Sequence, residues 1–109
     1  MKFLFALLAL HVAWLWWLNE AVADQGASRG IALANACAAC HGPDGRSRGA
    51  IPSIDHLSAE DFTSALKAFR ADTRNGTVMN RIGKGLDDAD IAAMAAYFAG
   101  RRGATPRRQ

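Results

Sequence analysis

The most informative segment of this chain is Cys37-Ala38-Ala39-Cys40-His41. The spacing Cys-x-x-Cys-His is the attachment signature of a c-type haem. Each thiol adds to one haem vinyl group, and the adjacent imidazole then reaches the iron as its proximal ligand. No other residue types suit these roles, because vinyl groups need sulfur nucleophiles and the iron needs an imidazole nitrogen. The motif predicts one covalently bound haem c, held by Cys37, Cys40 and His41.

Two other chemistries use cysteines at similar spacing. A thioredoxin-like dithiol belongs in a βαβ setting, but no run of β-branched residues precedes Cys37. A zinc site needs a second pair of ligands, but after His41 the sequence offers only His56 and no further cysteine. Haem attachment is therefore favoured over a dithiol protein and over a metal site.

The opposite face of the iron has three candidate ligands after the motif: His56, Met79 and Met94. Met94 lies at helical spacing from other apolar residues, which favours a role in core packing. His56 lies beside a predicted helix start and is interpreted as a surface residue. Met79 lies in a polar, glycine-containing segment, where a methionine has no core role. We therefore expect Met79 to be the sixth ligand.

Ligation by His41 and Met79 predicts an electron carrier. A thioether ligand favours Fe(II) and raises the reduction potential relative to two histidines. Because both axial positions are filled, such a site exchanges an electron and makes no bonds, so an enzyme is not expected. The alternative is a haem protein with an open or labile sixth site, active as a peroxidase or in gas binding.

The sequence predicts an all-α fold. Helices are expected over residues 28–39, 59–71 and 88–99, with a short helical turn over 80–83. No alternating β pattern appears. The remaining loop, residues 42–57, contains glycines that allow a close backbone approach to a flat cofactor.

Capping residues set the expected helix ends. Ser28, Ser58 and Asp87 are the predicted N-caps, and Gly100 is expected to close the last helix. Gly30 removes a side chain from the first helix and so permits another helix to approach it closely.

The N-terminus resembles a targeting segment. Lys2 precedes an apolar stretch from Phe3 to Leu18, and Ala21-Val22-Ala23 fits the small-x-small cleavage rule. We expect residues 1–23 to be a secretory signal peptide and residues 24–109 to be a periplasmic monohaem domain. An uncleaved anchor is the alternative, with its tryptophans at the membrane interface; only in that case is membrane contact expected.

The apolar content is unevenly distributed. Half of the 109 residues are apolar, but only sixteen large apolar side chains follow residue 23. Small domains bury little surface and often depend on a metal or cofactor, so a buried haem would complete this core. The net charge of +3 is too small to indicate nucleic-acid binding. The basic tail at 101–109 is interpreted as a solvated end.

Residues 28–100 resemble a class I cytochrome c. The shared features are an N-terminal helix, the haem motif, the Pro52-Ser53-Ile54 loop, a late methionine and a C-terminal helix with the pair Tyr97-Phe98. The resemblance implies a cytochrome c-like fold of three main helices around the haem. It also implies that the Pro52 carbonyl accepts the His41 N–H, and that Gly30 lies against the aromatic pair.

A narrower resemblance concerns the partner. The stretches around the haem motif, Ala50-Ile-Pro-Ser-Ile, Thr77-Val-Met and Asp-Ile-Ala-Ala-Met-Ala-Ala-Tyr-Phe are similar to the cytochrome subunit of flavocytochrome c sulfide dehydrogenases. In that family a flavoprotein oxidises sulfide and passes electrons to the haem subunit. The resemblance implies a single-haem version with a flavoprotein partner. Residues 70–76 depart from the pattern, because they lack the expected Pro-Ser before Thr-Val-Met.

Overall fold

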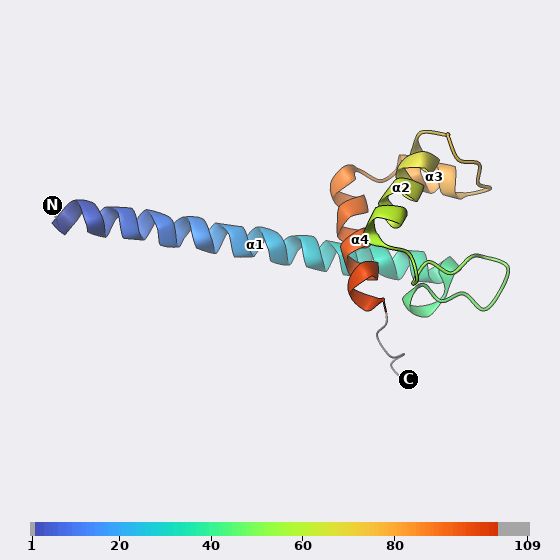
Figure 1. Cartoon of the computed structure of the whole chain (residues 1–109), viewed down its shortest axis with the longest axis horizontal. Coiled ribbons are helices and arrows are strands. Elements are labelled where there is room, and N and C mark those ends of the chain that lie inside the picture. The colour runs from blue at the N-terminus through green and yellow to red at the C-terminus, as the bar shows by residue number, and fades with distance from the viewer. Residues whose placement is uncertain (1, 103–109) are drawn as a thin grey trace.

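The chain forms a small helical domain with one long projecting helix (Figure 1). The computed structural model describes residues 2–102, with side chains from residue 10 onward; residues 103–109, most of the expected basic tail, lie outside the described part. Within it there are four α-helices, one 3-10 turn and no strand, so the all-α prediction is confirmed. The elements are α1 (Lys2–His41), η1 (Pro43–Gly45), α2 (Ala59–Arg70), α3 (Met79–Lys84) and α4 (Asp88–Arg101).

Helix α1 begins much earlier than the sequence pattern predicts. It runs unbroken from Lys2 to His41, so the prediction of Ser28 as an N-cap was wrong. Ser28 lies inside the helix, and its hydroxyl donates to the Gln25 carbonyl at 3.0 Å. The first part of α1 projects from the domain (Figure 1), and large apolar residues from Leu10 to Val22 are exposed there. In the part of the chain that the structure describes, no helix has the length and apolar character needed to cross a membrane.

The other helices begin where the capping residues predict. The Ser58 hydroxyl accepts the Asp61 N–H at 3.0 Å at the start of α2. Asp87 and Asp90 form a reciprocal capping box at the start of α4, which satisfies two of its free N–H groups. The end of α4 differs from the prediction, because Gly100 lies inside the helix and Arg102 forms the C-cap.

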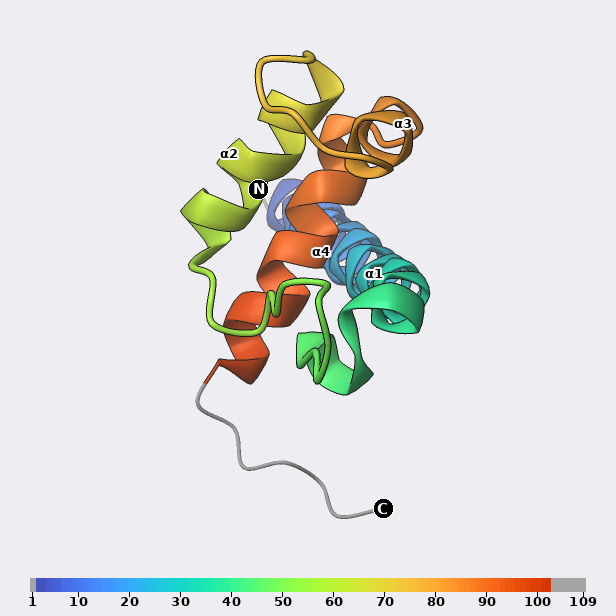
Figure 2. The same ribbon diagram turned by 90° about the vertical axis from the view of Figure 1, so that its right-hand side faces the viewer.

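Helix α4 is the centre of the domain. It lies between α1 and α2 (Figure 2). The described core is small, and its buried apolar residues come from α1, α2 and α4: Ala34, Phe62, Leu66, Ile91, Met94, Ala95 and Phe98.

The crossing of α1 and α4 depends on Gly30. A Cβ at Gly30 would lie 2.6 Å from the carbonyl oxygen of Ala93 and 3.0 Å from its carbonyl carbon. These atoms belong to the backbone and cannot move aside. The three atoms nearest to such a Cβ all belong to Ala93, one turn before Tyr97 in α4, and the Phe98 ring lies close to Gly45.

Replacing Gly30 with Val is expected to destabilise the domain by about 1–3 kcal/mol or more, since the helices must separate. Gly26→Val is the matched control, because nothing lies within 4 Å of a Cβ there. Denaturant unfolding of the two variants measures the difference. Equal free energies of unfolding would show that the close crossing does not constrain the fold.

Candidate haem site

The three residues of the motif lie on the last turns of α1. Residues three and four apart share one face of a helix, so Cys37, Cys40 and His41 face the same side. Both cysteines are free thiols, Cys37 half-buried and Cys40 exposed, whereas His41 is buried. The helix thus presents two sulfur nucleophiles beside one imidazole.

The His41 ring is held by the backbone of the following loop. Its Nδ1 lies 2.6 Å from the carbonyl oxygen of Pro52. Because a carbonyl can only accept, Nδ1 carries the proton and donates it. In the neutral ring the other nitrogen, Nε2, then carries the lone pair and is the atom able to bind a metal. A hydrogen bond of this kind also fixes the orientation of a ligating ring.

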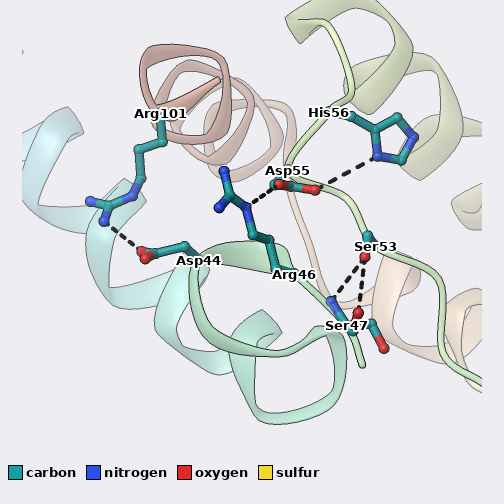
Figure 3. Close-up of polar contacts among 7 residues, drawn as sticks. All are labelled: Asp44, Arg46, Ser47, Ser53, Asp55, His56 and Arg101. Atoms are coloured by element: carbon teal, nitrogen blue, oxygen red, sulfur yellow. Dashed lines mark hydrogen bonds and ion pairs between the residues drawn. The ribbon is translucent and has the colours of Figure 1, made fainter. Parts of the chain in front are cut away.

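The loop that carries Pro52 is closed by contacts between its two limbs (Figure 3). The Ile54 N–H donates to the Gly45 carbonyl at 2.8 Å. The Ser47 N–H donates to the Ser53 hydroxyl at 2.9 Å. These bonds bracket Pro52 and limit the movement of its carbonyl.

Two ion pairs complete the loop. The first pair joins the two limbs of the loop, with Arg46 Nε 2.6 Å from Asp55 Oδ2 (Figure 3). The second pair connects the loop to the end of α4, with Arg101 Nη2 2.5 Å from Asp44 Oδ1. Exposed pairs contribute little individually, but together with the backbone bonds they define one loop conformation. His56 is exposed, and its Nδ1 lies 3.7 Å from Asp55 Oδ1, which fits a surface role.

Cys37 packs against the core methionine. Its Sγ lies 3.8 Å from Sδ of Met94, and Met94 is 1 % exposed. Burial raises the pKa of the Cys37 thiol, because a thiolate is poorly solvated there. The location of Met94 in the core supports its interpretation as a packing residue.

Met79 is the first residue of α3. Its side chain is half-buried and packs against the core, so the expectation that a methionine in this segment has no core role was wrong. The predicted turn over 80–83 is thus a short helix that begins at Met79 itself.

Sequence reasoning missed Asn80, the residue after Met79. Its side-chain amide bonds to four residues of the preceding segment, all between 2.8 and 3.1 Å: the carbonyls of Phe69 and Arg74, a carboxylate oxygen of Asp72 and the N–H of Gly76. No periodicity or motif marks such a residue. The one available signal was that asparagine readily bonds to nearby backbone groups.

A second missed contact joins the terminal helices. Arg29 of α1 donates to the buried carboxylate of Asp90 in α4. This hydrogen bond is the main reason why the pKa of Asp90 lies below its usual value. The carboxylate stays ionised and bonds to both Arg29 and the Asp87 N–H. Asp90 therefore links the start of α4 to α1.

The donor set fits a covalently attached haem. Two thiols on one helix face can each bind a vinyl group, and the oriented imidazole offers Nε2 to the iron. Among the residues that the structure describes, no group of three or more His, Cys, Asp or Glu side chains gathers as a metal site.

Comparison with known proteins identifies the family. The family model for cytochrome c matches residues 27–100. The chain is 44% identical over 80 residues to the cytochrome subunit of sulfide dehydrogenase from Chlorobaculum tepidum, covering 73% of each chain. It is 40% identical over 67 residues to cytochrome c-554(548) of Halomonas halodenitrificans, covering 58% of this chain and 81% of the relative.

A third relative is matched over nearly its whole length. The chain is 34% identical over 78 residues to cytochrome c-553 of Desulfomicrobium norvegicum, covering 69% of this chain and 94% of the relative. Both the matched regions and the attachment motif indicate a cytochrome c. The chain belongs to the cytochrome c family, binds one haem c covalently, and transfers electrons without being an enzyme itself.

Proposed function

We propose that this protein is a periplasmic electron carrier whose haem iron is ligated by His41 and Met79. We further propose that it accepts electrons from a flavoprotein that oxidises sulfide. The observation that carries the proposal is the 2.6 Å contact between His41 Nδ1 and the Pro52 carbonyl. It leaves Nε2 free to bind the iron, as an axial ligand requires.

Met79 is the best-supported sixth ligand among the three candidates. Met94 is committed to the core beside Cys37, and His56 is exposed and faces Asp55. Met79 opens a short helix and keeps a half-buried side chain. When bound, a haem with imidazole and thioether ligands supplies reversible one-electron exchange.

The partner is proposed from similarity. The Chlorobaculum tepidum relative is the cytochrome subunit of a sulfide dehydrogenase. The resemblance of the haem segment, the 50–54 loop and the last helix to such subunits supports a flavoprotein donor.

Export is proposed from the leader. Residues 1–23 form the expected signal peptide, with cleavage after Ala23. Within the leader, residues 10–23 have described side chains; these are exposed and contribute nothing to the described core. The family match begins at residue 27. Both observations support cleavage after Ala23.

The donor can be tested with purified components. We expect sulfide to reduce the oxidised holoprotein only when the sulfide-oxidising flavoprotein from the same organism is present, at a rate that rises with flavoprotein concentration. Stopped-flow absorbance of the haem measures the rate, and sulfide without flavoprotein is the control. A rate independent of the flavoprotein would remove this donor and leave the carrier function in place.

A further inference from the structure

The segment before Met79 is bonded to the end of α2 only at its start, where the N–H groups of Thr73 and Arg74 donate to the Ala68 carbonyl. Every residue from 71 to 78 is exposed, so the core does not fix this loop. Helix α3 is only six residues long, and its N-cap, Val78, makes no side-chain cap. A helix this short is not stable by itself. Met79 packs against the core and α3 lies against α2 at Gly83, and contacts between the loop and the start of α3 add to these.

Asn80 supplies those contacts. Its Oδ1 accepts the Gly76 N–H at 2.8 Å. Its Nδ2 donates to the Phe69 carbonyl at 3.0 Å and to the Arg74 carbonyl at 2.9 Å. One side chain thus joins the end of α2, the middle of the loop and the start of α3.

Further contacts close the same loop. Nδ2 of Asn80 also lies 3.1 Å from Oδ1 of Asp72, and the other oxygen of that carboxylate lies 2.6 Å from Lys84 Nζ. The Arg74 guanidinium lies 4.7 Å from the centre of the Phe69 ring. Because Asp72 and Lys84 are both more than half exposed, their ion pair is weak. The asparagine amide is therefore the main link between this loop and the start of α3.

We propose that Asn80 is a positioning residue for the sixth ligand: by fixing the end of α2 and the following loop to the start of α3, it limits the release of Met79 from the iron. This inference rests on the proposed ligation by Met79. A methionine on an ordered loop is released rarely, whereas one on a loose loop yields its place to a competing ligand. Asn80 would thus keep competing ligands off the iron, so that the site transfers electrons and does not bind other molecules.

The test uses imidazole as the competing ligand on the ferric holoprotein. Asn80→Ala is expected to bind imidazole about 10–100-fold more tightly than the wild type, because several hydrogen bonds that hold the loop are lost. Alanine is the better helix former, so α3 itself is not weakened. Absorbance titration gives the dissociation constants.

A core variant separates loop loosening from general destabilisation. Ile91 is fully buried in α4, so Ile91→Val lowers stability without touching the loop. Its imidazole affinity is expected to stay within about twofold of the wild type. Equal affinities in Asn80→Ala and Ile91→Val would overturn the role of Asn80.

Two further results separate the ligation by Met79 from the positioning role of Asn80. A wild-type ferric protein without the weak red absorption band of a methionine–iron bond removes both the Met79 ligation and the role of Asn80. If the wild type shows that band and Asn80→Ala has no effect on imidazole binding, only the role of Asn80 is overturned.

If the Asn80→Ala variant takes up no haem, amide exchange in the wild type tests the role of Asn80 instead. The Gly76 N–H should exchange about a hundredfold more slowly than in a free peptide. An unprotected Gly76 amide would contradict the proposal.

Discussion

Replacing Met79 with Ala is expected to lower the haem reduction potential by roughly 0.1–0.3 V, part of the ~0.8 V range that axial ligands span. The thioether stabilises Fe(II), and its loss removes that preference. The same variant should bind CO when reduced, because one axial position becomes open. Potentiometric titration and CO difference spectra measure the two effects.

Met94→Ala is the matched control, since it removes the other methionine of the domain. Met94 is buried in the core, so this variant should cost about 2–5 kcal/mol of stability with little change in spectrum or potential. An unchanged potential in Met79→Ala would exclude Met79 as the ligand. CO binding by the wild type at neutral pH would favour an open sixth site.

Preventing haem attachment is expected to abolish the cooperative fold. In the double variant Cys37→Ala/Cys40→Ala neither thioether can form. The described core then consists of seven buried apolar residues, two of them alanines, which is too little for a domain of this size to remain folded. We expect the loss of a cooperative thermal transition, measured by circular dichroism.

The single variant Cys40→Ala serves as the control for this experiment. It keeps the half-buried Cys37 and the His41 ligand, so it is expected to hold haem through one thioether and to unfold cooperatively. A double variant that unfolds at the wild-type temperature would show that the protein core suffices without the cofactor.

Local patterns predicted the helices well. The apolar spacing and the caps at Ser58 and Asp87 located α2 and the start of α4 within a residue, because a cap bonds to N–H groups only a few residues away. The predictions of two helix ends were wrong because they used local signals alone. Ser28 can cap a helix, but here residues on both sides are helical, and Gly100 permits a helix to end without requiring it.

Contacts between distant residues could not be predicted from patterns. The Arg29–Asp90 bond and the Gly30–Ala93 approach both join α1 to α4, and each depends on how the two helices cross. The four bonds of Asn80 depend on a loop conformation that no spacing encodes.

The attachment chemistry of this protein is encoded locally in its amino-acid sequence. Two thiols and an imidazole within five residues specify haem attachment, because the reacting groups share one helix face whatever the rest of the chain does. The folded chain fixes how these groups are held. The contact between His41 and the Pro52 carbonyl was expected only from the resemblance to class I cytochromes c, and the Asn80 contacts across the loop before Met79 were not expected from the sequence at all. Such contacts exist only after the chain has folded, since they join groups that are distant or irregularly spaced along it.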